Sequence, residues 1–240
     1  MLSKTKGIVL HSIKYSESSR IITIYTELFG RISYLVRGIN KRKSPTKVAF
    51  FQPLSLVEME VVHVPTKDIQ TIKEIRIDIA FGGIPYDPVK NALALFIAEF
   101  LYRIIRLTVP DSRMFQYISN ALQFLDCSSE SLANFHLVFM IGLSRFLGFE
   151  PNNSDQAAKF FDLLNGIFEH NKPLHTHYLR DEKVDLFSRL IETDFFNMHQ
   201  VKLSREQRNE QLDSLIEYYR LHVNGFQGLN STAVLQNLFD

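Results

Sequence analysis

Alternation of apolar and polar residues along residues 4–80 is the feature that most restricts how this 240-residue chain can fold. Segments 6–14, 20–28, 32–36, 49–64 and 69–79 are rich in β-branched and apolar residues, and turn-forming residues separate them. Five short strands within about eighty residues, with one long connection, are typical of a small closed barrel. We predict an OB-fold, with an SH3-like barrel as the runner-up, because strand count alone does not separate the two.

The third of these segments leads into a strongly basic run. Ile32, Tyr34 and Val36 occupy alternate positions, which predicts that they share the buried face of a strand. Gly38 ends the strand, and a polar segment with Pro45 follows as a predicted loop. Residues 31–47 hold six cations and no acidic residue: Arg31, Arg37, Lys41, Arg42, Lys43 and Lys47.

A single basic run is commonly only a solvated loop, but the charge balance favours a polyanion site. The whole chain has a net charge of +1, whereas residues 1–50 carry ten basic and two acidic side chains. The first fifth therefore has a charge of +8 and the remainder −7. This asymmetry predicts a nucleic-acid-binding part joined to a part with another task.

Nucleic-acid binding by a barrel needs cations for the phosphates, and bases can stack on exposed aromatic rings. The candidate rings in the barrel region are Tyr15, Tyr25, Tyr34, Phe50 and Phe51. We expect each of them to pack in the core, as large aromatic side chains commonly do. The sequence thus favours binding of the phosphate backbone over recognition of base sequence.

The second half reads as helical. A Gly/Pro break at residues 81–86 precedes Asp87 and Pro88, which predict the N-cap and first position of a buried helix through residue 106. Further helices are predicted over residues 112–125, 130–147, 184–193 and 205–223, with Gly148 as a stop and a capping box at residues 204–207. A hairpin around Asn165 and Gly166 is expected within residues 160–168. We therefore predict an α+β protein with an N-terminal domain over residues 1–81 and a mostly α-helical domain over residues 82–240.

Motifs for catalysis, phosphate binding and metal binding are absent from the sequence. It contains no Walker A loop, dinucleotide fingerprint, H-E-x-x-H or G-x-S-x-G. The single cysteine, Cys127, cannot form an intramolecular disulfide, and we interpret His175 and His177 as residues of an aqueous loop. We expect no metal, no cofactor and no enzymatic activity. No apolar run is long enough to span a bilayer, and the first residues lack the apolar core of a signal peptide, so we expect a cytoplasmic protein without a membrane partner.

Ordered motifs along most of the chain resemble the RecO family of bacterial recombination mediators. The N-terminal ones are K-G-I-V-L at residues 6–10, Glu17, T-x-x-x-G-R at residues 26–31, and Gly38 with Ser44. The later ones lie at residues 98–101, 147–151, 161–163 with Gly166, and 218–235 with Gly225. Each is modest alone, whereas the ordered set is specific.

This resemblance implies an N-terminal OB-fold, a helical domain and a role without catalysis. It implies annealing of complementary single strands and help to RecA, together with RecR, in replacing single-strand-binding protein (SSB) on DNA. Carried onto this chain, the single-stranded DNA surface comprises Arg20, Arg31, Arg37, Lys41, Arg42, Lys43 and Lys47. Many relatives have a four-cysteine zinc site after the Gly-Phe-Glu-Pro segment, and residues 152–167 here contain no cysteine.

The resemblance also implies a site in the helical domain for the acidic, Phe-ended C-terminal tail of SSB. Such a site needs an apolar pocket edged by cations. Arg103, Arg106 and Arg145 are the candidates, although they could simply interact with helix ends or pair with Glu99 at i,i+4 spacing. Two other classes of function stay open: an adaptor whose basic loop meets an acidic protein, and an RNA-binding barrel protein.

Overall fold

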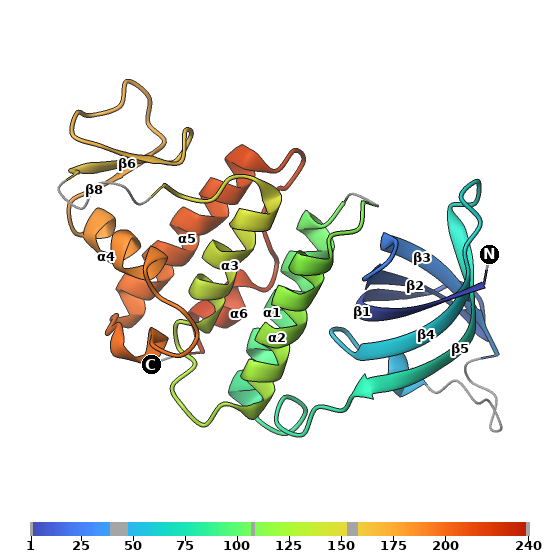
Figure 1. Cartoon of the computed structure of the whole chain (residues 1–240). Coiled ribbons are helices and arrows are strands. Elements are labelled where there is room, and N and C mark those ends of the chain that lie inside the picture. Colours follow the sequence, from blue (N-terminus) through green and yellow to red (C-terminus); the bar gives the residue numbers. More distant parts are fainter. Residues whose placement is uncertain (1, 39–47, 107–108, 153–157, 239–240) are drawn as a thin grey trace. The chain divides into compact units, whose positions relative to one another are not determined.

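A computed structural model describes residues 2–38, 48–106, 109–152 and 158–238. The chain forms two compact units, Met1–Asp126 and Cys127–Asp240 (Figure 1). The first unit contains the barrel and two helices, and the second contains four further helices and a small sheet in its described residues. The fold is α+β, as predicted. No helix in the described ranges is long and apolar enough to cross a membrane.

Five strands close the barrel in the order β1-β2-β3-β5-β4. They are β1 (Leu2–Lys14), β2 (Ser19–Thr26), β3 (Gly30–Arg37), β4 (Leu56–Val62) and β5 (Ile69–Ile79). All neighbours are antiparallel except β3 and β5, which pair in parallel through Ser33 with Ile69 and Tyr34 with Gln70. This order confirms the OB-fold over the SH3-like alternative.

Strand β1 closes the barrel by pairing with both β2 and β4. Its first part, from Leu2 to Ile8, pairs with β4, and its second part, from Gly7 to Lys14, pairs with β2. Gly7 lies where the two ladders overlap, and a Cβ there would stand 2.6 Å from Ile24 Cγ2 and 2.9 Å from Met59 Cε. Only glycine allows this close approach without a shift of the core.

The barrel core is made by the inward-facing residues that the alternation predicts. Tyr34 is fully buried, and Ile32 and Val36 are buried beside it, while Arg37 is exposed. Strands β2 and β4 contribute Ile22, Ile24, Val57, Met59 and Val61 to the same cluster.

The expected strand over residues 49–64 was wrong in its first half. Val48–Phe51 form a 3-10 turn (η1), and β4 starts only at Leu56. Pro53 has no N–H for a ladder, and Leu54 has a positive φ of 66°, so the chain turns before it can pair. Phe51 is buried in the barrel core as a result.

Helices α1 (Pro88–Ile104) and α2 (Ser112–Cys127) follow the barrel. The Asp87 side chain accepts hydrogen bonds from the backbone N–H groups of Val89 and Lys90, which confirms the predicted N-cap. Asp126 accepts hydrogen bonds from the backbone N–H groups of Gly82, Gly83 and Ile84 and so fixes the segment between barrel and α1. The first compact unit thus extends past residue 81. The domain boundary proposed at that residue stays a prediction.

The second unit comprises α3 (Phe135–Leu147), α4 (Glu182–Ile191), α5 (Arg205–His222), α6 (Thr232–Gln236) and the short turn η2 (Met198–Gln200). Its sheet has the order β7-β6-β8, with β6 (Phe160–Asp162), β7 (Ile167–Glu169) and β8 (Tyr178–Arg180). The hairpin around Asn165 and Gly166, the stop at Gly148 and the capping box of Ser204 and Gln207 are all confirmed.

Helix α3 begins at Phe135 and not at residue 130 as expected. The Asn134 side chain instead donates hydrogen bonds to the carbonyls of Met198 (3.2 Å) and Val201 (2.7 Å), which ties the residue before the helix to η2. Strand β8 was not predicted, because three residues are too few to show a period.

Candidate nucleic-acid interface

One end of the barrel gathers basic residues around the β1–β2 turn. The register places Lys14 opposite Arg20 and Ser19 opposite Arg37, so these three cations come from adjacent strand ends. Arg20 is half-buried, and its Nη1 donates to the Ser12 hydroxyl at 3.3 Å, while Lys14 and Arg37 are exposed. Local positive charge of this kind suits a polyanion.

The basic run is attached at this same end. The backbone N–H of Gly38 donates to the carbonyl of Ser18 in the β1–β2 turn, at 2.7 Å. Gly38 is the last described residue before the cluster of Lys41, Arg42 and Lys43, so the chain leaves the barrel beside Lys14 and Arg20. The predicted DNA-binding residues Lys41, Arg42, Lys43 and Lys47 lie outside the described residues.

Tyr15 supplies an aromatic ring at this end. Its side chain is 65% exposed in the β1–β2 turn, so the expectation that it packs in the core was wrong. Tyr25, Tyr34 and Phe51 are buried, as expected, and Phe50 packs against the core cluster. Burial raises the pKa of Tyr25 to about 12. We name Lys14, Tyr15, Arg20 and Arg37 the β1–β2 end. Lys14 and Tyr15 were not among the predicted DNA-binding residues, although their position beside a predicted turn, close to Arg20, could have indicated them.

Arg31 occupies the other end of β3 and already has partners. Its Nη1 donates to the carbonyl of Tyr102 at 2.7 Å and to that of Ile105, and its guanidinium carbon lies 4.7 Å from the centre of the Tyr102 ring. These carbonyls belong to the last turn of α1, where a cation is favourable. Burial lowers the pKa of the Arg31 guanidinium. Arg31 therefore holds the helix end against the barrel, a role that sequence alone did not suggest.

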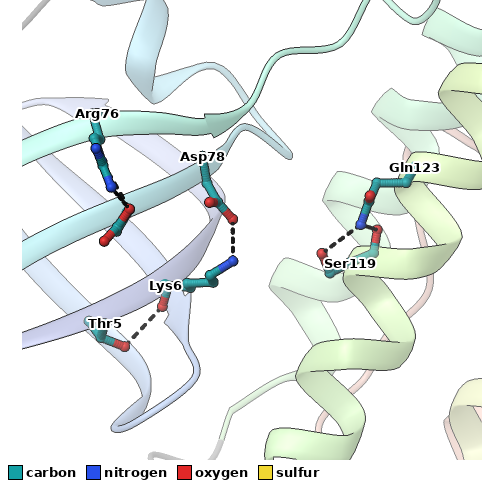
Figure 2. A network of polar contacts seen from close by, with 7 residues as sticks. Thr5, Lys6, Arg76, Asp78, Ser119 and Gln123 are labelled. Atoms are coloured by element: carbon teal, nitrogen blue, oxygen red, sulfur yellow. Dashed lines mark hydrogen bonds and ion pairs between the residues drawn. The ribbon is translucent and has the colours of Figure 1, made fainter.

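On the β4–β5 side of the barrel, Lys6 and Arg76 are paired with carboxylates. Lys6 Nζ lies 2.9 Å from Asp78 Oδ2, and Arg76 Nε donates to Glu58 Oε2 at 2.9 Å; Figure 2 shows the Lys6 and Arg76 side chains in these contacts. The hydrogen bond to Asp78 raises the pKa of Lys6. Local neutralisation makes this side a weaker attractor for phosphates than the β1–β2 end.

The arginines predicted for the SSB tail lie in both units. Arg103 pairs with Glu99 at 2.8 Å, which confirms the i,i+4 alternative, and Arg106 Nε donates to the Arg103 carbonyl at 3.1 Å. Arg145, in the second unit, pairs with Glu150 at 2.6 Å. A ligand carboxylate would have to compete with Glu99 and Glu150 for these guanidinium groups.

Two histidines of the second unit, His175 and His177, are paired with carboxylates. His175 Nε2 lies 3.1 Å from Asp162 Oδ2, and His177 Nδ1 lies 2.7 Å from Glu217 Oε1. Both side chains are partly exposed and lie in the connection between β7 and β8, in keeping with the expected loop. Within the described ranges, no group of three or more His, Cys, Asp or Glu side chains is arranged to hold a metal ion.

Comparison with known proteins agrees with this architecture. The family model described as "Recombination protein O N terminal" matches residues 1–79, and that described as "Recombination protein O C terminal" matches residues 85–232. Proteins named DNA repair protein RecO are similar over the whole of both chains, with 43% identity in Bacteroides fragilis (strain YCH46), 42% in Phocaeicola vulgatus and 34% in Porphyromonas gingivalis (strain W83). The two matched segments meet between the barrel and α1. The chain therefore belongs to the RecO family of DNA repair and recombination proteins.

Proposed function

We propose that this protein binds single-stranded DNA at the β1–β2 end and the adjoining basic run, and that it anneals complementary strands without catalysing a covalent step. The observation that carries the proposal is the gathering of Lys14, Arg20, Arg37 and the exposed Tyr15 where the basic run leaves an OB-fold barrel. Cations neutralise phosphates regardless of sequence, and an exposed ring accepts any base.

Family membership supports the wider role. In this proposal the protein acts in the cytoplasm with RecR and helps RecA to replace SSB on single-stranded DNA. Annealing needs two strands held with their charge screened and their bases free to pair, and a surface that binds phosphates without reading bases meets that need.

The test is a salt series with single-stranded DNA. Replacing Lys41, Arg42 and Lys43 with glutamate should weaken binding more than tenfold at low salt and reduce the log–log salt slope by about 2, because each phosphate contact on a single strand contributes about 0.7. The matched control replaces Lys159, Lys172 and Lys202, exposed lysines of the second unit, with glutamate. Strand annealing should fall in parallel with binding in the first variant and not in the control.

Other outcomes would redirect the assignment. Equal affinity of both triple variants and wild type at every salt concentration would place the DNA site elsewhere. Tighter binding of RNA than of DNA with the same sequence would favour the RNA-binding alternative. No binding of either nucleic acid would favour an adaptor that meets an acidic protein.

We further propose that the SSB tail binds near Arg103, Arg106 or Arg145. Each lies in the last turn of an apolar helix or just beyond it, where a peptide carboxylate would bind in competition with Glu99 or Glu150 at Arg103 and Arg145. Titration of a labelled tail peptide should show weaker binding to at least one of Arg103→Ala, Arg106→Ala and Arg145→Ala, by about five- to tenfold, which is typical of one charge-assisted contact. Unchanged affinity in all three would contradict the location, and no binding by wild type would contradict the partner.

A further inference from the structure

A second groove lies on the first unit at the end of β3 opposite to Arg37. It has a volume of about 590 Å³. The β2–β3 turn, the start of β3, the β4–β5 connection and residues just beyond α1 line it. We call it the His63 groove, because His63 of the β4–β5 connection is among its lining residues.

The groove has two stacked aromatic rings in its lining. Phe29 packs against the barrel core, and the His63 ring stacks on Phe29 with 4.3 Å between ring centroids and 9° between planes. Both rings are half-buried and line the groove. Aromatic side chains are the platforms on which nucleobases stack in single-strand-binding barrels.

The connection that carries His63 is shaped before any ligand binds. Gln70 is 3% exposed, and its side chain accepts a hydrogen bond from Val64 N–H at 2.8 Å. The same amide donates to the carbonyls of Val64 at 2.8 Å and Lys67 at 2.5 Å. A buried amide with these bonds fixes the loop, so a ligand would meet little ordering cost.

The charge of the lining is positive. Arg31, Lys67 and Arg106 contribute cations, and Asp68 is the carboxylate among the lining residues. Lys67 is exposed on the β4–β5 connection, and Arg106 is exposed just after α1. A flat ring beside an excess of cations complements a molecule with a planar base and a phosphate.

We propose that the His63 groove binds one nucleotide of a single strand, with its base stacked on His63 and its phosphate facing Lys67 and Arg106. This inference rests on the proposed function and adds a subsite to it. The outward positions of β3, which include Ser33 in the groove and Leu35 beyond it, connect the groove to Arg37. The eight residues of β3 span about 26 Å, a length that suits the roughly 4–16 nucleotides bound by one OB-fold.

The experiment uses the full chain and a thymidine oligonucleotide that carries one 5-iododeoxyuridine. Affinity is measured over a salt series for wild type, His63→Ala, His63→Phe, Lys67→Glu and the matched control Lys73→Glu, which places the same charge change at an exposed site on β5. His63→Ala should weaken binding about five- to tenfold, and His63→Phe should restore it because a ring is present again. Lys67→Glu should weaken binding about tenfold and lower the salt slope by about 0.7, whereas Lys73→Glu should match wild type. Photo-crosslinks should map to His63 or to neighbouring residues of the groove.

The outcomes separate this subsite from the proposed function. If wild type binds no single strand, the proposed function fails, and the subsite fails with it. If wild type binds but His63→Ala and Lys67→Glu bind as tightly as Lys73→Glu, only the subsite is overturned. Loss of binding to an acidic peptide ending in phenylalanine, with unchanged DNA affinity, would make the groove a peptide site and also overturn the proposal. Circular dichroism of His63→Phe checks that the fold is intact.

Discussion

His136 is a titratable side chain held inside the second unit. It is 1% exposed on α3, and burial, together with the positive charge of Arg208, lowers its pKa from 6.5 to about 3. The folded chain thus keeps His136 neutral at pH values where an unfolded chain would protonate it. This difference links the free energy of unfolding to pH.

We predict that acid weakens the second unit through His136. Below pH 6.5 the unfolded state binds a proton that the folded state does not. The free energy of unfolding therefore falls as pH decreases from 6.5 towards 3, whereas above pH 6.5 His136 causes no such loss. The loss is about 1.4 kcal/mol per pH unit, or roughly 2–3 kcal/mol between pH 6.5 and 4.5. Urea unfolding followed by circular dichroism at both pH values should show this loss in wild type and a smaller one in His136→Gln. The exposed His170→Gln serves as the control, and an equal pH dependence in all three proteins would contradict the prediction.

Individual residues show where sequence reasoning reaches its limit. The burial of Tyr34 follows from period-2 alternation, because its strand neighbours set the face on which it lies. The partners of Arg31 cannot be predicted in this way, since the carbonyls of Tyr102 and Ile105 are distant in sequence and only the tertiary fold brings them close. Tyr15 was assigned to the core on general preference, whereas its position in a turn leaves it in water.

Among the elements, the three-stranded sheet of the second unit has a hydrogen-bond network centred on Asp162. Asp162 accepts bonds from the N–H groups of Leu164 and Asn165, from the Asn165 amide and from His175. Burial alone would raise the pKa of Asp162, but these bonds outweigh it and hold the pKa below its usual value. The turn between β6 and β7 is thereby closed by a carboxylate within the chain.

We predict that the purified protein contains no stoichiometric zinc. Structural zinc sites use four closely placed nitrogen or sulfur ligands, usually with thiolates. The one cysteine of this chain, Cys127, ends α2, and α3 separates it from the sheet in the sequence. Elemental analysis should find far less than one zinc per chain, and a chelator should leave the thermal midpoint unchanged. One zinc per chain that disappears in a His175→Ala, His177→Ala double variant would contradict this expectation.

Element boundaries were predictable where local chemistry sets them. The capping box of Ser204 and Gln207 starts α5, and Gly148, with a φ of 84°, ends α3, because both depend on residues within one turn. The start of α3 was missed, since it depends on the bonds from Asn134 to η2, which are more than sixty residues away. The turn at η1 was missed because the apolar residues around Phe51 resemble a strand until Leu54 takes its positive φ.

At the scale of the whole molecule, the first compact unit extends beyond the barrel to Asp126. Tyr25, which is 1% exposed on β2, donates its hydroxyl to the Asp111 carbonyl at 3.2 Å and lies 6.0 Å from the Phe115 ring. Arg31 holds the end of α1 in the same way. Strand periodicity predicted a small closed barrel, but it could not show that two helices pack against the barrel.

We predict that a fragment of residues 1–126 is more stable than a fragment of residues 1–81. The shorter fragment exposes Tyr25 and leaves Arg31 without its acceptors on α1, a difference of about 3 kcal/mol. With a urea dependence of about 1–3 kcal/mol per molar, the unfolding midpoint of the longer fragment should lie about 1–3 M higher. Equal midpoints would instead support a folding boundary at residue 81.

The short parallel ladder between β3 and β5 has a consequence for where the barrel can open locally. Within the described residues this ladder pairs Ser33 with Ile69 and Tyr34 with Gln70, whereas the ladders of β1 and β2 with their neighbours run along most of each strand. Separation of β3 from β5 breaks few hydrogen bonds, so the cylinder can open at this seam by a sub-global fluctuation that leaves the other four ladders intact. We therefore expect amide hydrogens at the seam to exchange with solvent sooner than those of β1 and β2.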